Sequence, residues 1–289
     1  MEIRDTIRKV ADRMSLGEGE AHAAMGQVMD GQATPAQIAA LMTALRMKGE
    51  TVDEIAGFAR AMRERAQRIT PDAEALIDVV GTGGDRLNTF NISTTAAFVV
   101  AAAGGYVAKH GNRAVSRLSG AADVLEALGV QIQVSPDVVR SAIETIGIGF
   151  MFAPIYHAAM KHAVAPRREI GLRTVFNILG PLTNPANAGF LVVGAYDAAL
   201  TEIMARVLGE MGARRAFVVH GLDGLDEVST VGPTQVSELR QGSVRTYITT
   251  PEELGVSRAP AASIAGGTPA ENAAITTAVL QGREGPALE

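Results

Sequence analysis

The sequence predicts an α/β protein in which a small all-helical domain precedes a larger domain with a central, mostly parallel sheet. Residues 1–70 carry only helical patterns. From residue 71 to residue 289, short continuous apolar runs alternate with helical runs, which is typical of a parallel sheet covered on both faces. The chain has 289 residues, enough for one large domain or two smaller ones.

Capping signals locate the helices of the first domain. Thr34 and Pro35 form an N-cap followed by proline at the first helical position. Thr51 and Glu54 form a capping box ahead of another apolar-periodic run. Gly49 stands between the two patterns, where a helix should end. We therefore expect one helix after Thr34 and a second after Thr51.

Five apolar runs predict the strands of the second domain, near residues 76–80, 106–111, 130–134, 189–196 and 215–221. One stretch, 157–186, interrupts the alternation with two arginine clusters and the sequence NILGPLTNP. We expect this stretch to leave the sheet and to rejoin the helical domain.

Composition excludes several classes of partner. The net charge of −5, the 4% of aromatic residues and the absence of Trp argue against nucleic acid, whose binding needs a basic surface or stacking platforms. There is no Cys, hence no disulfide and no zinc–thiolate site. The charged, amphipathic start is unlike a signal peptide, and no apolar run reaches the ~20 residues that span a bilayer. We expect a cytoplasmic protein with no membrane partner.

A glycine-rich loop follows the first predicted strand, at GTGGD (residues 81–85). Successive backbone N–H groups without Cβ obstruction can hold an anion, and the N-terminus of the next helix adds a positive dipole. Asn91, Ser93 and Thr94 add small polar groups suited to phosphate oxygens or a metal. A tight strand-to-helix turn with N-cap residues explains the same pattern, and this alternative stays open here.

Two further loops carry charge at predicted strand ends. KHGNRAVS (residues 109–116) places two cations and an imidazole where ligands bind in an open α/β sheet. HGLDGLDE (residues 220–227) contains three carboxylates, which suit Mg²⁺ or, alternatively, an acidic helix start. Together the three loops describe a site for a phosphorylated, Mg²⁺-bound substrate. No Cys or G-x-S-x-G nucleophile is present, so catalysis should rest on positioning and charge stabilisation.

The sequence resembles the anthranilate phosphoribosyltransferases, whose fold is shared with pyrimidine nucleoside phosphorylases. The resemblance rests on GTGGD, NIST, KHGNRAVS, MFAPIYHAAMKH, RTVFNILGPLTNP and HGLDGLDEVS, which occur in one order and cover nearly the whole chain. It implies transfer of the phosphoribosyl group of 5-phosphoribosyl 1-pyrophosphate (PRPP) to anthranilate, in tryptophan biosynthesis. It also implies a homodimer paired through the helical domain, and a requirement for Mg²⁺ with two ions per subunit.

The resemblance also assigns residues, and no covalent nucleophile or general base is among them. It implies that PRPP is contacted by Gly81, Gly84, Asp85, Thr89, Asn91, Ile92, Ser93, Thr94, Lys109, Gly111, Asn112, Arg113, Ser116 and Ala121. For anthranilate it implies Gly81, His110, Asn112, His157 and Arg167, and for Mg²⁺ it implies Ser93, Asp226 and Glu227. Ion pairs or solvent contacts are expected for the side chains of Arg113, Arg168 and Arg173.

The chain departs from the usual family pattern after KHGNRAV. Arg117 stands for a small residue, Leu118 for a lysine, and Ala121 for a hydroxyl-bearing residue. We expect the Arg117 guanidinium to replace the lysine charge; the alternative is that this long side chain obstructs the loop. Ala158 stands where a proline is usual, and the usual C-terminal helices are expected to be lacking.

Two alternatives to the transferase use the same architecture. A pyrimidine nucleoside phosphorylase has a similar glycine loop but no need for a pyrophosphate-bound metal. A non-catalytic homologue that binds nucleic acid should be basic and should lack the carboxylates at residues 226 and 227. The acidic loop and the net charge favour the transferase.

Overall fold

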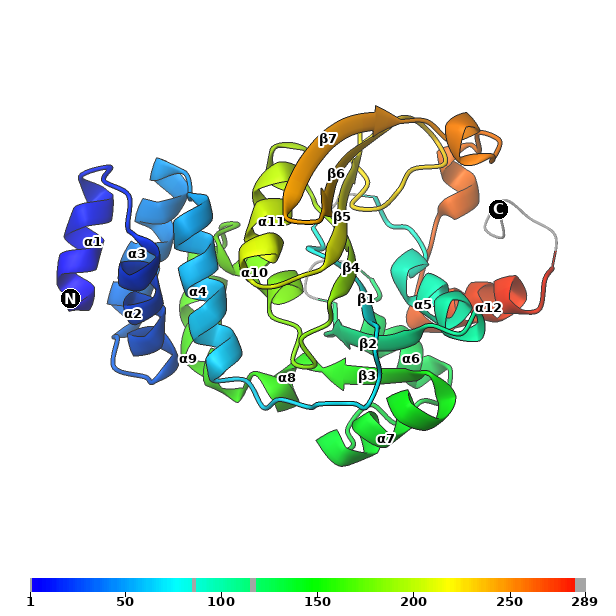
Figure 1. The fold of residues 1–289 in the computed structure, drawn as a ribbon, viewed down its shortest axis with the longest axis horizontal. Coiled ribbons are helices and arrows are strands. Elements are labelled where there is room, and N and C mark those ends of the chain that lie inside the picture. Colours follow the sequence, from blue (N-terminus) through cyan, green and yellow to red (C-terminus); the bar gives the residue numbers. More distant parts are fainter. Residues whose placement is uncertain (1, 85–86, 115–117, 284–289) are drawn as a thin grey trace.

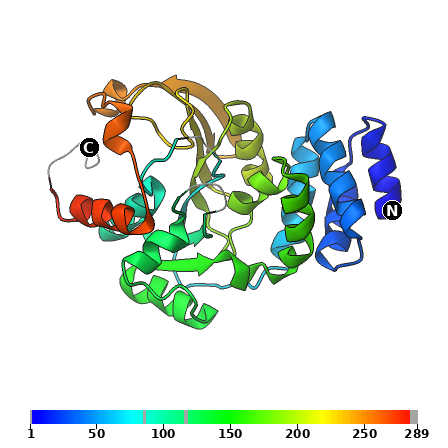
Figure 2. The ribbon, with the colours of Figure 1, turned by 180° about the vertical axis from the view of Figure 1, so that it is seen from behind.

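The computed structural model describes residues 2–84, 87–114 and 118–283. A helical domain lies at one end, next to a larger domain built around a twisted sheet (Figures 1 and 2). The predicted combination of a small helical domain and a mostly parallel sheet is confirmed. None of the described helices is long and apolar enough to cross a bilayer.

The helical domain gathers helices from both parts of the sequence: α1 (Ile3–Ala11), α2 (Glu18–Met29), α3 (Pro35–Lys48), α4 (Val52–Glu64) and α9 (Lys161–Ile170). The Thr34 and Thr51 hydroxyls accept from the backbone N–H groups of Gln37 and Glu54, so both expected N-caps are present. Helix α9 packs on α3 and α2, which is how the 157–186 stretch rejoins this domain.

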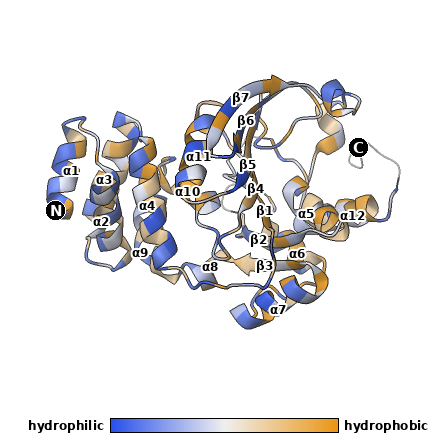
Figure 3. Ribbon diagram, in the orientation of Figure 1, coloured by the Kyte–Doolittle hydropathy of each residue, from blue (hydrophilic) through white to orange (hydrophobic). Residues whose placement is uncertain are grey.

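The sheet has seven strands in the order β3-β2-β1-β4-β5-β6-β7. They are β1 (Leu76–Gly81), β2 (Tyr106–Gly111), β3 (Ile148–Phe152), β4 (Phe190–Gly194), β5 (Arg215–Gly221), β6 (Thr234–Arg240) and β7 (Ser243–Thr249). The first five strands in this order pair in parallel, and β6 and β7 continue the sheet in antiparallel fashion. Figure 3 shows the apolar character of the central strands.

The order of the strands fixes where a ligand can bind. From β1 the chain continues to β2 and β3 on one side, and then to β4 and β5 on the other. The strand order therefore reverses between β1 and β4, and ligands of open α/β sheets bind at such a point, at the carboxyl ends of the strands. Gly81 and Gly194 face each other there in register.

One predicted strand is wrong. Residues 130–134 form no regular strand, and the place beside β2 is taken by β3, which the apolar-run analysis had not singled out. Ile132 is buried beside Leu125 and Phe152, while the glutamines on either side of it are largely exposed. An irregular segment can bury one side chain as well as a strand can, so the alternation of VQIQV did not require a strand.

Helices cover the sheet and complete the larger domain: α5 (Ile92–Ala102), α6 (Ala121–Ala127), α7 (Pro136–Ile146), α8 (Ala153–Tyr156), α10 (Phe176–Leu182), α11 (Ala199–Glu210) and α12 (Pro269–Leu280), with 3-10 turns at Ala158–Met160, Glu252–Leu254 and Ala261–Ile264. Helix α11 packs on β5, β6 and also on α4 of the helical domain. Helix α12 packs on α5 and α6, away from the helical domain (Figure 1).

Candidate functional site

The glycine-rich loop begins where β1 ends. The Thr82 N–H donates to the Gly194 carbonyl at 2.8 Å, and the Thr82 hydroxyl accepts from Tyr196 N–H at 3.0 Å. Gly83 and Gly84 follow with φ of 63° and 84°, a left-handed conformation that favours glycine. The loop is thus anchored to β4 at its start and then turns with its backbone unobstructed, as an anion-binding loop requires.

Helix α5 starts just after this loop, with Asn91 as its N-cap residue. The Asn91 carbonyl accepts the N–H groups of Thr94 and Thr95 at 3.0 and 2.9 Å, and Thr94 is buried. The Asn91 side chain does not cap the helix. Its Oδ1 instead accepts from Ser119 Oγ at 3.1 Å, so NIST and the loop after β2 are joined directly.

The acidic loop after β5 lies against the same strand ends. Asp226 is 2% exposed, and a Cβ placed on Gly81 would lie 3.0 Å from its Oδ2. Glu227 Oε1 accepts from Ser93 Oγ at 2.5 Å, across 134 residues of sequence. By contrast, Asp223 closes its own loop by accepting from Ser229 Oγ at 2.5 Å. Two of the three carboxylates therefore face the site, and they are the two assigned to metal.

Lys109 is buried beneath the loops, at 3% exposure. Its Nζ donates to the Val79 carbonyl at 2.5 Å. Burial lowers its pKa, while the charges of Asp78 and Glu227 oppose that shift. The cation therefore lies between a buried carboxylate of β1 and the acidic loop, and its charge acts on the site from below.

The loop after β2 is held together by Asp123. This carboxylate accepts from the N–H groups of Ala114 and Gly120, both at 2.9 Å. Arg113 pairs with Asp123 and Glu126 at 3.1 and 2.5 Å, so its guanidinium has the ion-pair role that the sequence led us to expect. The Asn112 side chain accepts from Arg113 N–H at 2.8 Å.

Several sequence-assigned positions have backbone or packing roles. Thr89 pairs with Ala265 in an isolated bridge. The Ile92 N–H donates to the Phe90 carbonyl at 2.8 Å, and a Cβ on Gly111 would lie 3.2 Å from that of Ala121. Leu118 is 61% exposed. Asp85, Ser116 and Arg117 lie outside the described residues.

Two buried histidines form a second group, beside α8 and α10. The rings of His110 and His157 are 5.0 Å apart between centroids. Burial lowers the pKa of His110 to about 3 and that of His157 to about 4, although backbone hydrogen bonds to Gly180 and Thr183 oppose the shifts. Both rings are therefore neutral at pH 7. Among the described residues, Nε2 of each has no hydrogen-bond partner.

Arg167 lies on α9 with its guanidinium over the Phe176 ring, at 5.4 Å. Burial lowers its pKa. Within the described part of the chain Arg167 forms no ion pair, and no hydrogen bond joins it to the glycine-rich loop or to the loop after β2. A largely buried cation that lacks a carboxylate partner is costly unless an anion binds to it.

Arg173 is solvent-exposed, one of the two expected alternatives, but it also makes contacts that the sequence did not predict. In the described structure it forms no ion pair with a carboxylate. Its guanidinium lies over the Tyr196 ring at 4.6 Å and donates to the Gly84 carbonyl. The segment after α9 therefore contacts the glycine-rich loop directly. Sequence spacing gave no signal for this contact, since 89 residues separate the two partners.

Two buried polar residues were missed by the sequence analysis. Asp78 is fully buried in β1 and accepts from His110 N–H at 3.2 Å and from Asn184 Nδ2 at 2.6 Å. Asn184 also donates to the Ala108 carbonyl at 2.9 Å. An aspartate within the apolar run LIDVV was the available signal, because a charge buried in a strand needs partners.

The comparisons with known families agree with this arrangement. The model of the glycosyl transferase family a/b domain matches residues 73–289, and that of the family's helical bundle domain matches residues 4–66. The chain therefore belongs to this glycosyl transferase family.

Individual relatives show to which class of enzymes within this family the chain belongs. The chain is 57% identical to the anthranilate phosphoribosyltransferase of Moorella thermoacetica, over 99% of this chain and 85% of that protein. The crystal structure of anthranilate phosphoribosyltransferase from Thermus thermophilus superposes with a TM-score of 0.93 at 46% identity, covering 98% of this chain and 85% of that one. Within the glycosyl transferases, this chain belongs to the anthranilate phosphoribosyltransferases, and it is an enzyme of that class.

Solved complexes of a more distant relative show what that protein binds. The anthranilate phosphoribosyltransferase of Saccharomyces cerevisiae, 29% identical, has been solved with PRPP and Mg; its TM-score is 0.86, and 95% of this chain and 80% of that one are covered. Another structure of the yeast enzyme contains 4-fluoroanthranilate. The relatives are transferases, so neither the phosphorylase nor the nucleic-acid-binding alternative is supported.

Proposed function

We propose that this chain transfers the phosphoribosyl group of PRPP to anthranilate at the carboxyl ends of β1, β2, β4 and β5, as a step of tryptophan biosynthesis. One observation carries the placement: Ser93 and Glu227, which come from different loops, meet at 2.5 Å beside the glycine-rich turn. Their oxygens, the buried Asp226 and the backbone of residues 81–84 converge on one region. That region suits a pyrophosphate with its metal.

The donor set fits Mg²⁺. This ion binds oxygen ligands, usually one or two carboxylates, and completes its shell with water and substrate phosphates. The described residues contain no cluster of three or more His, Asp and Glu side chains of the kind that would form an all-protein cage. Ser93, Asp226 and Glu227 would hold the metal, in two ions per subunit, and bound Mg²⁺ would neutralise charge on the pyrophosphate.

The chain's own groups prepare the donor for displacement. The backbone of residues 81–84 and the first turn of α5 bind phosphate oxygens, and Lys109 adds a buried positive charge. These fixed donors stabilise the charge that develops as pyrophosphate leaves the anomeric carbon. They also orient that carbon toward the acceptor, which makes the reaction effectively unimolecular.

The acceptor would lie between the histidine pair and Arg167. The Arg167 guanidinium suits the anthranilate carboxylate, to which it can donate two parallel hydrogen bonds. His110 and His157 are neutral, and each keeps an Nε2 that can accept from the anthranilate amino group. The neutral aryl amine can then attack the anomeric carbon without a strong base.

Anthranilate fluorescence gives the direct test. Wild-type chain should consume anthranilate only when PRPP and Mg²⁺ are both present. Asp226→Asn combined with Glu227→Gln should reduce kcat at least a hundredfold while thermal unfolding shows a folded protein. The matched control, Glu74→Gln with Asp137→Asn, removes two exposed carboxylates elsewhere and should retain wild-type activity. Unchanged turnover in the first double variant across a Mg²⁺ titration would contradict the metal assignment.

Two further expectations belong to the same proposal. The cavity between α1 and α3, beside the exposed Met47, supports pairing of two chains into a homodimer. A biosynthetic role and a sequence without Cys support a cytoplasmic location.

A further inference from the structure

Helix α12 contacts the start of α5 through a partly buried side-chain hydrogen bond. Asn272 Nδ2 donates to Asn91 Oδ1 at 2.9 Å, across 181 residues of sequence. Asn272 is only 1% exposed. None of the functions assigned above uses α12, yet this bond reaches the residue that precedes the phosphate-binding turn.

The Asn272 amide is held in one orientation. Its Oδ1 accepts from Gly267 N–H at 2.8 Å, so its Nδ2 must face Asn91. One turn later, the hydroxyls of Thr276 and Thr95 are 2.9 Å apart in a fully buried contact. Two successive turns of α12 are therefore hydrogen-bonded to the start of α5.

Asn91 is the point where three segments meet. Its Oδ1 accepts from both Asn272 and Ser119 Oγ, and its Nδ2 donates to the Ser119 carbonyl at 3.4 Å. Its backbone carbonyl starts α5 by accepting from Thr94 and Thr95. The rotamer of Asn91 thus sets the spacing between the turn at residues 92–94 and the loop at residues 118–120.

We propose that Asn272 is a positioning residue for the phosphoribosyl end of the site, acting through Asn91. The proposal rests on the function proposed above, since it concerns how the loops close on PRPP. Without the Asn272 donor, Asn91 loses one of its two Oδ1 partners and can rotate, so the turn and the loop no longer hold a fixed spacing. Anthranilate binding should be spared, because Arg167 and His157 lie on other elements.

Two substitutions of Asn272 separate positioning from loss of fold. Asn272→Ala removes both hydrogen bonds. Asn272→Asp keeps the size and the acceptor for Gly267 but offers no amide donor to Asn91. Both variants should raise the KM for PRPP at least fivefold and leave the KM for anthranilate within twofold. Thr277→Ala is the matched control, because the exposed Thr277 hydroxyl donates only to the Ala273 carbonyl of its own helix.

A double-variant cycle tests the route through Asn91. Ser119→Ala removes the other donor to Asn91 Oδ1, so its effect on the KM for PRPP should be non-additive with that of Asn272→Ala. Calorimetry with PRPP and Mg²⁺ should show the same loss of affinity without turnover, and thermal unfolding of the ligand-free variants identifies any that fail to fold.

The outcomes are distinct. An equal rise in both KM values, or PRPP affinity equal to wild type in a folded variant, would overturn the role of Asn272. Wild-type chain that binds PRPP but makes no product would overturn the proposed function instead, while the calorimetric comparison would still decide on Asn272. If wild-type chain does not bind PRPP, both are wrong.

Discussion

Burial without charge compensation is the common property of the acceptor-side residues. His110 and His157 are 5% and 8% exposed and keep an unpartnered Nε2. A buried imidazole favours its neutral form, and a neutral ring offers an acceptor instead of a cation. The anthranilate carboxylate then has one strong partner, which would fix its orientation.

The depressed pKa of His157 predicts an acid-sensitive contribution to stability. In the unfolded chain the ring binds a proton near pH 6.5, but in the folded chain only near pH 4. Below pH 6.5 the unfolded state therefore binds more protons, so this stabilisation is present above pH 6.5 and is lost as the pH falls toward 4. At pH 5 the loss should be about 2 kcal/mol.

Chemical denaturation at pH 7 and pH 5 measures this effect. His157→Asn keeps a donor near the Thr183 carbonyl but does not titrate, so its free energy of unfolding should fall less between the two pH values than that of wild type. The comparison isolates His157 from Asp78, whose pKa is raised by burial to about 6 and which acts in the opposite sense. Equal pH dependence in both proteins would mean that His157 protonates normally in the fold.

Arg167 should govern affinity for anthranilate alone. Arg167→Ala should raise the KM for anthranilate by the loss of one charge-assisted contact, roughly 1.5–3 kcal/mol, and should change the KM for PRPP much less. Arg168→Ala is the matched control, because Arg168 is the exposed neighbour on the same helix. Steady-state kinetics in both substrates decides, and an equal rise in both constants would contradict the assignment.

At this scale the sequence predicted which residues lie at strand ends better than it predicted their partners. The positions of the strand-end loops could be predicted because glycines and charged residues follow apolar runs in the sequence. The bond between Ser93 and Glu227 spans 134 residues, and the contact of Arg173 with Gly84 depends on how α9 leaves the helical domain. Such long-range pairs are set by tertiary packing, which local periodicity does not encode.

At the scale of elements, a buried polar clamp connects β1, β2 and the end of α10. Asn184 donates to Asp78 Oδ2 and to the Ala108 carbonyl, and its own Oδ1 accepts from Ala186 N–H at 2.8 Å. These bonds satisfy a carboxylate that is fully buried. Asp78 also accepts from His110 N–H, and its charge acts on Lys109, so the clamp supports both the donor side and the acceptor side of the site.

Removal of this clamp should destabilise the protein strongly. Asn184→Ala leaves a buried carboxylate oxygen and two backbone groups without their partner, which should cost about 3 kcal/mol or more. Gln133→Ala is the milder comparison, because Gln133 is exposed in the irregular segment after α6. Urea denaturation at pH 7 checks the difference. A loss below 1 kcal/mol for Asn184→Ala would show that water replaces the amide.

The elements themselves were largely predictable from the sequence, with instructive exceptions. The helix starts at Thr34 and Thr51 and four of the five expected strands are confirmed. The strand expected at residues 130–134 was wrong, because only one side chain of its alternating pattern is buried and an irregular segment buries it. The antiparallel pair β6 and β7 was not anticipated, since much of β7 is exposed and lacks a continuous apolar run.

At the scale of the molecule, the two domains are joined by arginines of α4. Arg63 donates to the Met211 carbonyl at the end of α11, to Leu182 O and to Asn187 Oδ1, at 2.9, 3.1 and 2.6 Å. Arg60 donates to the Glu210 carbonyl at 2.8 Å. Cations at a helix C-terminus satisfy its last carbonyls and its dipole. Helix α4 is thereby fixed to the larger domain, and the outer face of the helical domain is left for other contacts.

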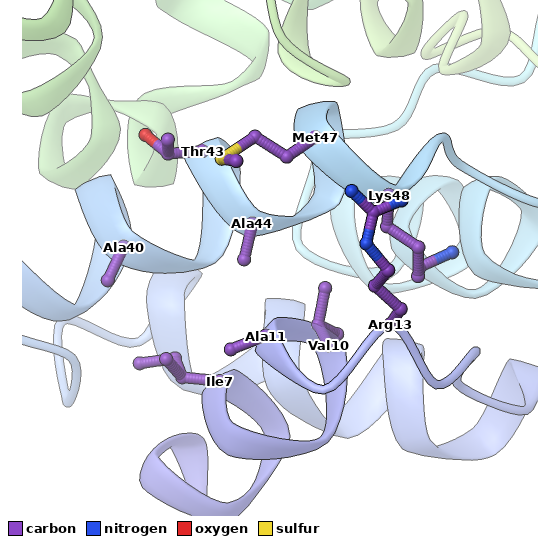
Figure 4. Close-up of a pocket in the computed structure, with 9 residues that line it drawn as sticks. All are labelled: Ile7, Val10, Ala11, Arg13, Ala40, Thr43, Ala44, Met47 and Lys48. Carbon is purple, nitrogen blue, oxygen red and sulfur yellow. The ribbon is translucent and has the colours of Figure 1, made fainter.

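That outer face carries a cavity of about 310 Å³ between α1 and α3 (Figure 4). Its floor is apolar, with Ile7, Val10, Ala40 and Ala44, while Arg13 and Lys48 also line it and Met47 beside them is 71% exposed. An exposed apolar patch of this kind on a globular protein is typical of a contact surface. We therefore expect two chains to pair through the helical domain, about a two-fold axis that would bring the same patch of each chain together.

A single charge in this patch should separate the chains. Ala44→Arg adds a guanidinium to the cavity that Arg13 and Lys48 already line, and it does so in both subunits at once because a two-fold interface repeats every change. The added like charges should repel across the contact. In size-exclusion chromatography with light scattering at micromolar concentration, wild-type chain should have twice the mass of the monomer, and Ala44→Arg should have the mass of one chain. Val138→Arg, on the exposed side of α7, is the control and should stay dimeric. A monomeric wild type would contradict the homodimer, and a dimer that persists in Ala44→Arg would place the interface elsewhere. The turnover of the monomeric variant would show whether each active site is complete within one subunit.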